Sequence, residues 1–323
     1  MLQDQKILIT GMTGQIAFPM AAYLAEHNEV WGIARFSAEG SRERVEAAGV
    51  HTEVVDVADG DFSLLPDDFD YLVHMAAYQS PGLDYDWALR VNAEGTGLLM
   101  AHCSKAKAAL IASTCSVYHP QPDPWHHYTE TDRLGDSNAV HAPTYSMSKI
   151  SEEAVARTMA RALGLPTTVA RINASYGPNG GLAAYHLDWI MAGQPVRLRA
   201  PAPSPYSPIH QDDMNEQVEP LLAAASVPAT VVNWGGDEAV TAEDWVDLFG
   251  ELSGREPEVI YDEFPGSQPG NIADPTRRIE LTGPCRVPWR DGMSGVYEAR
   301  YPGGRPASDI GGGERLTAAY GND

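Results

Sequence analysis

Two glycines, Gly11 and Gly14, separate the first apolar run of the chain from its first helical segment. The run Lys6–Thr10 has the length and composition of a buried strand, and a helical pattern follows over Ile16–Glu26. Gly11 allows a tight turn, and Ala17 lets the helix pack close to the strand. This strand–turn–helix unit constrains the fold most strongly, because it is typical of sheets in which strands and helices alternate.

The same alternation continues through the first half of the chain. Strand, helix and strand repeated in this way predict a doubly wound parallel sheet in an α/β protein. The strands are uniformly apolar, which fits a sheet covered on both faces. The other expected strands are Glu29–Ala34, Thr52–Val55, Tyr71–Met75, Ala109–Thr114 and Pro166–Ile172, and the other expected helices are Arg42–Ala48, Asp84–Lys105 and Thr144–Leu163.

After Gly177 the pattern changes. The segment Pro201–Pro208 is a loop or linker, since so many prolines cannot continue a helix or a central strand. We expect the elements around it to form a smaller substrate lobe that closes over the carboxyl edge of the sheet. These elements are helices near Asp212–Ala225, Thr241–Leu252 and Pro275–Leu281 and a strand at Thr230–Asn233. The expected division is therefore a first domain over 1–177, a region over 178–301 that is mostly lobe, and a flexible tail over 302–323, which is rich in Gly, Ser and Asp.

The Gly-rich turn also predicts a ligand. Gly14 lets the backbone approach a pyrophosphate, and the N-terminus of the following helix faces the phosphates. We therefore expect a Rossmann-like dinucleotide-binding domain. The cofactor-binding residues expected in the turn are Gly11, Thr13, Gly14, Gln15 and Ile16.

The end of the second strand bears on which dinucleotide is bound. NAD enzymes with this motif usually carry an acidic residue there for the ribose 2′-hydroxyl. This chain carries Arg35, whose guanidinium suits a 2′-phosphate, and Ser37 and Arg42 offer further donors. The alternative is that Arg35 is a surface residue stacked on adenine. We expect NADP(H) to be preferred, with NAD(H) as the alternative.

Two further strand ends are expected to meet the cofactor. Asp56 and Val57 follow the third strand and are placed to meet the adenine, although Asp56 suits a helix cap equally well. Ala76 and Ala77 follow the fourth strand, where small side chains let the cofactor lie against the backbone. We expect His74 in that strand to be a packed residue rather than a catalyst.

Tyr145 and Lys149 carry the predicted chemistry. They are four residues apart in a predicted helix and so share one face. The ammonium can stabilise a tyrosinate, a base that free tyrosine does not supply near neutral pH. Thr114 ends the fifth strand, where its hydroxyl can bind a substrate oxygen; Ser113 and Ser116 are alternatives. The candidate catalytic residues are Thr114, Tyr145 and Lys149.

Charge and cysteine content narrow the possible partners. The chain has 44 acidic and 22 basic side chains and a formal net charge of -22, which argues against nucleic acid and anionic membranes. Cys103, Cys115 and Cys285 are sparse and lack metal-ligand spacing, so we expect a reducing compartment and no metal site. Without a signal peptide or an apolar stretch of roughly 20 residues, we expect a cytoplasmic protein.

As a set, the motifs resemble the extended branch of the short-chain dehydrogenase/reductase superfamily, the epimerase/dehydratase-like proteins. The resemblance runs from Lys6 to about Leu281, with the motifs in family order. It is specific for the family and less so for any one substrate. The motifs are Thr10–Ala17, Val91–Thr96, Ser113–Tyr118, Tyr145–Lys149, Arg171–Pro178 and Ile209–Asp213.

The resemblance implies a role for each catalytic candidate. Tyr145 would be the general acid/base, and Lys149 would hold the nicotinamide ribose and lower the pKa of Tyr145. Thr114 would orient the substrate oxygen while hydride passes between the nicotinamide and the substrate carbon. Asn92 aligns with a family asparagine, for which a cofactor-side or helix-bending structural role is at least as well supported as a catalytic one.

Four residues are candidates for the substrate pocket. Asn173 and Tyr176 lie where family members line the nicotinamide end and lead to the substrate. His119 replaces the usual glycine after the Val-Tyr pair and either projects toward the cleft or lies on a loop surface. Ser116 lies two residues beyond Thr114.

Departures from the family pattern affect the expected substrate. Members that dehydrate nucleotide sugars have an acidic residue soon after the position of Thr114, where this chain has Cys115 and Ser116. Sugar-nucleotide members tend to have a diphosphate-binding Arg just before the Ile-His segment, where this chain has Tyr206, Ser207 and Pro208. Four arginines offer a replacement for that role: Arg197, Arg199, Arg277 and Arg278.

These departures favour an oxidoreductase that transfers hydride between NADP(H) and a ketone, an aldehyde or a secondary alcohol of a small molecule. The alternatives are a nucleotide-sugar 4-epimerase or related enzyme with bound NAD, and a non-catalytic dinucleotide sensor. The resemblance also implies a homodimer formed through the helices Asp84–Lys105 and Thr144–Leu163.

Overall fold

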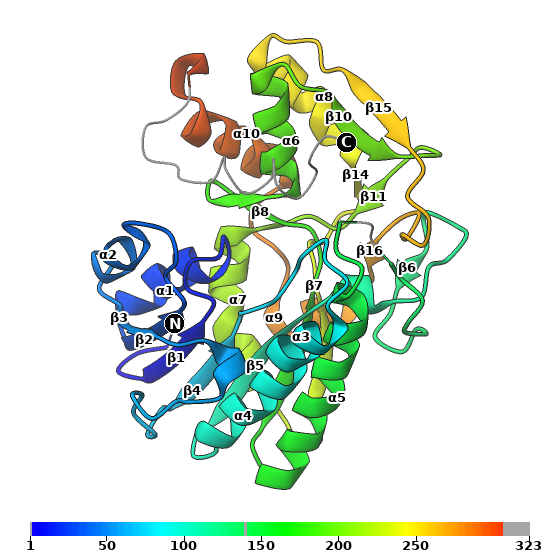
Figure 1. The fold of residues 1–323 in the computed structure, drawn as a ribbon. Helices are drawn as coiled ribbons and strands as arrows, with labels where there is room; N and C mark the ends of the chain where they lie inside the picture. The colour runs from blue at the N-terminus through cyan, green and yellow to red at the C-terminus, as the bar shows by residue number, and fades with distance from the viewer. Residues whose placement is uncertain (1, 139–140, 306–323) are drawn as a thin grey trace.

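The central feature is a sheet of seven parallel strands in the order β13-β7-β5-β4-β1-β2-β3 (Figure 1). The structure is a computed structural model that describes residues 2–138 and 141–305. This strand order confirms the predicted Rossmann-like, doubly wound sheet. The strands are β1 Lys6–Thr10, β2 Glu29–Ala34, β3 His51–Val54, β4 Tyr71–His74, β5 Ala108–Thr114, β7 Thr167–Ile172 and β13 Thr230–Trp234.

Helices cover both faces of this sheet, which is why its central strands are mostly apolar. On one face lie α1 (Ala17–Ala25) and α7 (Gln211–Ala223), and their apolar side chains share a core with β1. On the other face lie α4 (Gly95–His102) and α5 (Tyr145–Leu163) (Figure 1). Every residue of β5, in the middle of the sheet, is buried as a result.

The single helix expected over Asp84–Lys105 is divided into three parts. A helix α3 (Tyr85–Leu89) runs into one turn of π-helix (Arg90–Glu94), and α4 follows. The π turn contains Asn92, whose amide donates to the Tyr78 carbonyl at 3.0 Å and to Ser148 Oγ at 2.8 Å. Asn92 therefore joins the helix to the loop after β4 and to α5, in agreement with the structural alternative for this residue.

The lobe lies beyond the carboxyl edge of the sheet (Figure 1) and has its own core, in which Trp245 and Phe249 are fully buried. The prediction that Thr230–Asn233 belongs to the lobe is wrong, because this segment is the edge strand β13 of the central sheet. Helix α7 likewise packs on the sheet. The lobe instead uses α6 and α10, which the sequence pattern did not predict. Its main elements are α6 Leu182–Ala192, β10 Val196–Arg199, α8 Ala242–Ser253, β15 Val259–Asp262 and α10 Trp289–Arg300.

The remaining elements are short. The helices are α2 Ser41–Glu46 and α9 Thr276–Thr282, with 3-10 turns at Val57–Asp59, Cys115–Val117 and Pro302–Gly304. The strands are β6 His127–Tyr128, β8 Ser175–Gly177, β9 Gly180–Gly181, β11 Pro205–Tyr206, β12 Ile209–His210, β14 Val240–Thr241 and β16 Ile272–Ala273.

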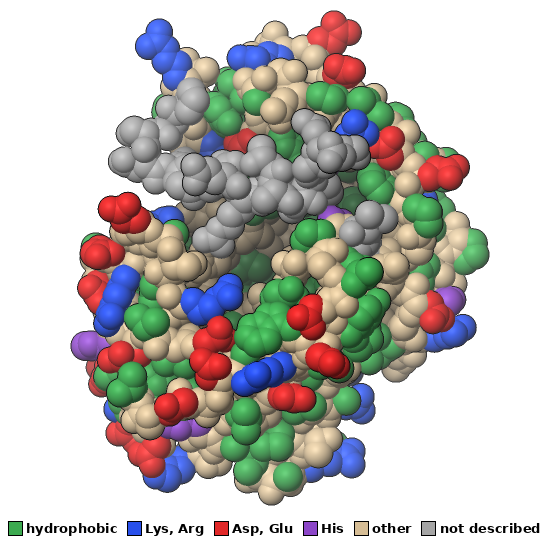
Figure 2. All heavy atoms as spheres, viewed as in Figure 1, with side chains coloured by type: hydrophobic (Ala, Val, Ile, Leu, Met, Phe, Trp, Pro, Cys, Tyr) green, Lys and Arg blue, Asp and Glu red, His purple; other side chains and the backbone are tan. Residues whose placement is uncertain are grey.

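The described part of the chain contains no helix long and apolar enough to cross a membrane, and no cluster of three His, Cys, Asp or Glu side chains suited to a metal ion. Its cysteines are all free thiols. The flexible tail expected over 302–323 lies outside the described residues from 306 onward. Figure 2 shows acidic and basic side chains interspersed over the sheet half of one face, and a hollow between that half and the lobe.

Candidate active site

The floor of the site is formed by the close approach of the ends of β1 and β4. Gly11 has a φ of +76°, and a Cβ there would lie 2.9 Å from Cα and N of Ala76, so only glycine fits. The hydroxyl of Thr10 accepts hydrogen bonds from the backbone N–H groups of Met75 (3.0 Å) and Ala76 (2.9 Å). These contacts fix the Gly-rich turn against the loop after β4.

The start of α1 suits an anionic ligand. Its N-cap residue, Ile16, provides no side-chain cap, and its first turn contains no acidic residue. Thr13, Gly14 and Gln15 are partly exposed beside this helix end. The positive end of the helix dipole fits the pyrophosphate of a dinucleotide, the ligand that the sequence motif predicts.

The residues expected at the adenosine end differ in whether their side chains already form hydrogen bonds or ion pairs within the described residues. Arg35 and Ser37 follow β2 and are exposed, and Arg35 has no side-chain hydrogen bond or ion pair within the described residues. Arg42, by contrast, binds Glu46 (2.9 Å) and Thr52 (2.8 Å). Arg42 is therefore already held by two neighbours, whereas Arg35 is held by none within the described residues.

At the two other strand ends, the expected residues other than Val57 are at least partly exposed. Asp56 Oδ1 accepts the Ala58 N–H at 3.0 Å, so the predicted capping role is present, and Val57 beside it is buried. Ala76 is half-buried, and Ala77 is exposed. The small side chains leave the backbone after β4 open on this side.

Thr114, Ser116 and Tyr145 come together at the carboxyl end of β5. Thr114 Oγ1 donates to Ser116 Oγ at 3.2 Å and also hydrogen-bonds the phenol of Tyr145, the first residue of α5. Burial raises the pKa of Tyr145 above its ordinary value, while the charge of Lys149 and the Thr114 hydrogen bond act to lower it. This is the predicted arrangement of a phenol, a hydroxyl and an ammonium.

Lys149 is almost completely buried, at 1 % exposure, one turn beyond Tyr145. Its ammonium donates to the Ala112 carbonyl at 2.7 Å and forms an ion pair with Glu152, which is 0 % exposed. Sequence reasoning missed Glu152. The available signal was its position three residues after Lys149, since i and i+3 share a helix face.

His74 lies behind this pair, buried as expected. Thr10 Oγ1 already accepts two backbone N–H groups, so it donates to His74 Nδ1 (2.7 Å). The proton of the neutral ring is then on Nε2, which lies 2.8 Å from Thr96 Oγ1. Burial and the nearby charge of Lys149 lower the pKa of His74 to about 3, so the ring is neutral and structural.

Three of the four pocket candidates are engaged elsewhere. Asn173 binds the Asn271 carbonyl (2.8 Å) and accepts the Ser207 N–H (2.9 Å), which ties the end of β7 to the lobe. Tyr176 is only 3 % exposed and packs edge-on against His210. His119 lies 3.1 Å from the exposed Asp136. Ser116 alone lies beside Thr114.

Two hydrogen bonds that the sequence did not reveal link the sheet half to the lobe. Tyr185 in α6 donates to Gln15 in the Gly-rich turn at 2.7 Å. Arg44 in α2 donates to Asn179, in the loop before α6, at 3.0 Å. The lobe is therefore attached directly beside the helix end that suits a pyrophosphate.

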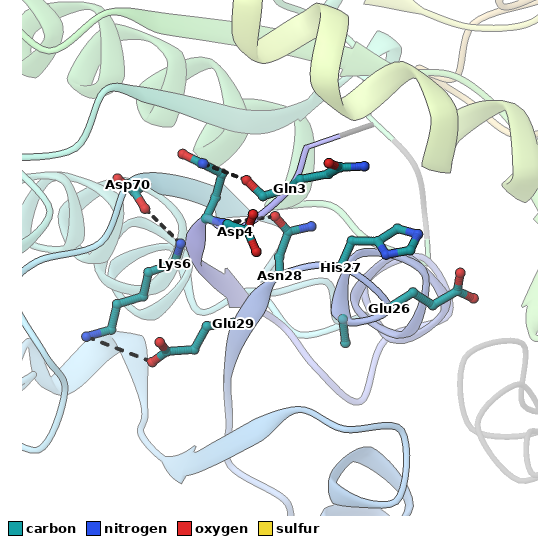
Figure 3. A pocket seen from close by; sticks show the side chains of 10 residues that line it. Gln3, Asp4, Lys6, Glu26, His27, Asn28, Glu29 and Asp70 are labelled. Atoms are coloured by element: carbon teal, nitrogen blue, oxygen red, sulfur yellow. Dashed lines mark hydrogen bonds and ion pairs between the residues drawn. The ribbon is translucent and has the colours of Figure 1, made fainter.

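A hollow of about 680 Å³ lies at the opposite end of the sheet (Figure 3). Lys6 and Glu29, which begin β1 and β2, line it together with Asp70, His27 and Asn28. Ligands of open α/β sheets bind at the carboxyl ends of the strands. This hollow is therefore separate from the candidate active site.

Residues 7–199 match the model of the NAD dependent epimerase/dehydratase family. The chain belongs to this family. The expected resemblance to the extended short-chain dehydrogenase/reductases is thereby confirmed. No curated protein shows a significant match.

Solved structures of this family share the fold. UDP-glucuronic acid 4-epimerase from Bacillus cereus, in complex with UDP-glucuronic acid and NAD, is 21% identical with a TM-score of 0.79 over 91% of this chain and 98% of that chain. UDP-glucose 4-epimerase from Thermotoga maritima is 22% identical with a TM-score of 0.78 over 91% and 98%. The Thermus thermophilus enzyme of the same name, in complex with NAD, is 22% identical with a TM-score of 0.77 over 91% and 99%.

Proposed function

We propose that this chain transfers hydride between a nicotinamide dinucleotide and a secondary alcohol or carbonyl carbon of a small molecule. The observation that carries the proposal is the contact of Thr114 with Tyr145 beside the buried ammonium of Lys149. The cofactor supplies or accepts the hydride. Tyr145 gives a proton to the substrate oxygen or removes one from it, Thr114 orients that oxygen, and Lys149 favours the tyrosinate.

The arginines of the lobe support a substrate without a diphosphate. Arg197 pairs with Asp262 at 2.5 Å, and the buried Arg278 pairs with Asp237. Arg199 is turned to Ser267 at 3.1 Å. Tyr206, at the position of the family's diphosphate-binding arginine, packs on Trp245 instead. Of the four arginines considered from the sequence, only Arg277 is exposed without a described partner.

The second candidate is a nucleotide-sugar 4-epimerase. Its support is the likeness in fold to the UDP-sugar 4-epimerases over nearly the whole chain. An epimerase retains its cofactor, because the hydride must return to the same substrate. The bonds Tyr185–Gln15 and Arg44–Asn179 would favour such retention.

For the cofactor we propose a preference for NADP(H). The support is Arg35, which is exposed and unengaged within the described residues and stands where NAD enzymes have an acidic residue. NAD is present in the solved complexes of the fold relatives. NAD(H) is therefore the alternative against which the preference must be measured.

We also propose a homodimer formed through α4 and α5. Leu98 in α4 is 49 % exposed, which leaves an apolar side chain on the outer face of these helices. Light scattering should give the mass of a dimer, and a charged Leu98→Glu variant should give that of a monomer.

The test of the proposed function compares wild type with Tyr145→Phe on two panels. One panel contains ketones and secondary alcohols with NADPH or NADP⁺, and the other contains UDP- and dTDP-sugars with the enzyme as purified. The oxidoreductase is supported if wild type turns over the first panel and Tyr145→Phe lowers that rate by about 10²-fold or more. Sugar epimerisation supports the second candidate. Turnover of either panel that is unaffected by Tyr145→Phe overturns the role of Tyr145.

A further inference from the structure

Two neighbouring carboxylates, Glu152 and Glu153, are buried on the inner face of α5. A buried carboxylate is costly unless a cation and hydrogen bonds compensate it. Glu153 is compensated by the guanidinium of Arg171, which it binds with both oxygens at 2.8 and 2.7 Å. Glu152 has no such dedicated partner, because its only cation within the described residues is Lys149.

The other groups that face Glu152 are neutral. Thr96 Oγ1 lies 3.4 Å from its Oε1, and His74 Nε2 lies 3.7 Å from the same atom. Burial and the charge of Lys149 keep His74 in its neutral form. Glu153 adds a negative charge along the helix, which Arg171 balances. Lys149 therefore supplies the only positive charge that compensates Glu152 among the described residues, and Thr96 adds one long hydrogen bond.

The same ammonium is also needed by Tyr145. The charge of Lys149 favours ionisation of the phenol, and the charge of Glu152 opposes it. With Glu152 ionised, the pair is neutral, and a tyrosinate would add an uncompensated negative charge to a buried group of residues. With Glu152 protonated, Lys149 and the tyrosinate balance each other.

We propose that Glu152 is a positioning residue for the hydride-transfer site, in which its carboxylate and the Tyr145 tyrosinate are alternative counter-ions of the Lys149 ammonium. The proposal rests on the proposed role of Tyr145. In the resting site Glu152 and the Ala112 carbonyl hold the ammonium in place. Moving the phenol proton of Tyr145 to Glu152 turns phenol and carboxylate into tyrosinate and carboxylic acid without change in net charge, and this tyrosinate is the form that accepts the proton of an alcohol substrate.

The electrostatics of Glu152 fit this exchange. Burial raises the pKa of its carboxyl to about 7, against the lowering effect of Lys149. The carboxyl can therefore gain and lose a proton near neutral pH. Two acids that share one cation titrate as a coupled pair.

The test is an NMR titration of the full chain with ring-labelled tyrosine, with and without NADP⁺. The Tyr145 signal is assigned by its absence in Tyr145→Phe. Glu152→Gln should lower the midpoint of the Tyr145 titration by about one pH unit or more. Glu152→Asp, which keeps the charge, should leave it near the wild-type value. Glu152→Met is a second neutral variant should the Gln variant fail to fold.

The matched control is Glu153→Gln, which removes a buried charge from the adjacent position. We expect a lower unfolding temperature and a Tyr145 midpoint close to that of wild type, because Glu153 pairs with Arg171. An unchanged midpoint in both neutral variants of Glu152, or an equal shift in Glu153→Gln, would overturn the proposal. The NMR readout needs no substrate. If the Glu152 variants shift the Tyr145 midpoint as expected but the protein turns over neither substrate panel, the proposed function is refuted and the link between Glu152 and Tyr145 still stands.

Discussion

Arg171 of β7 and Glu153 of α5 form a buried, two-point ion pair, in which Nε lies 2.8 Å from Oε1 and Nη2 lies 2.7 Å from Oε2. The same guanidinium donates to the Tyr118 hydroxyl (2.9 Å) and to the Glu130 carbonyl (3.1 Å). Glu153 also accepts the hydroxyl of Ser113 at 2.6 Å. One pair thus fixes the strand end that carries Thr114, the loop after it and the helix that carries Tyr145.

Removing one of the two charged side chains of this pair should strongly destabilise the protein. Arg171→Met leaves the Glu153 carboxylate buried without its cation, and we expect the free energy of unfolding to fall by about 3–5 kcal/mol. Chemical denaturation measures the change. The double variant Arg171→Met/Glu153→Leu should recover part of the loss, since neither charge is then left alone. A single variant as stable as wild type would contradict this account of the pair.

Cofactor choice should depend on Arg35. Titration of the wild type should show NADPH bound at least tenfold more tightly than NADH, about 1.4 kcal/mol. Arg35→Asp should abolish this preference, because a carboxylate repels a 2′-phosphate and can bind a ribose hydroxyl. Arg42→Ala is the control, since Arg42 is engaged by Glu46 and Thr52. A wild type that prefers NADH, or holds NAD that will not exchange, would refute the Arg35 argument.

Release of the cofactor should depend on the bond between Tyr185 and Gln15. Tyr185→Phe removes a hydrogen bond beside the pyrophosphate end of the site. One such bond contributes about 1 kcal/mol, so the dissociation rate of NADPH in stopped-flow measurements should rise about fivefold. Tyr85→Phe alters an exposed tyrosine of α3 and should leave the rate unchanged. An unaltered rate in Tyr185→Phe would show that the lobe does not retain the cofactor.

The pH dependence of stability should reflect buried neutral histidines. His186 accepts the Trp245 Nε1–H at 3.0 Å, and burial lowers its pKa to about 3. In the unfolded chain the pKa of His186 is near 6.5, so on acidification the unfolded chain binds a proton at His186 before the folded protein does. The contribution of His186 to stability is therefore complete above about pH 6.5 and is lost as the pH falls toward 3. Each buried histidine contributes a slope of about 1.4 kcal/mol per pH unit within this window.

Denaturation curves at several pH values test this. His186→Gln should have a shallower loss of stability between pH 6.5 and pH 4 than wild type, because one proton-linked group is removed. His27→Gln, which alters an exposed histidine, should keep the wild-type slope. Equal slopes in His186→Gln and wild type would mean that His186 does not govern acid sensitivity.

Sequence alone determined six of the seven sheet strands and the residues of the candidate active site, because both depend on local patterns. Apolar runs of strand length gave β1 and β2 with their observed bounds, and the i, i+4 spacing of Tyr145 and Lys149 placed them on one face of α5. Thr114 was expected at a strand end and lies there. Each of these features follows from short-range periodicity and from the rule that parallel strands share one carboxyl edge.

The tertiary structure decided what depends on contacts between distant segments. The strand β13 joins the sheet through pairing with β7, and α10 forms despite its glycines, one of which, Gly292, is needed because a Cβ would lie 2.5 Å from the Tyr176 hydroxyl. The ion pair of Glu152 with Lys149 was identified only from the structure, in which α5 packs against the sheet and buries both side chains. Local propensity does not encode such pairings, since burial and charge compensation arise only when segments far apart in the chain are brought together.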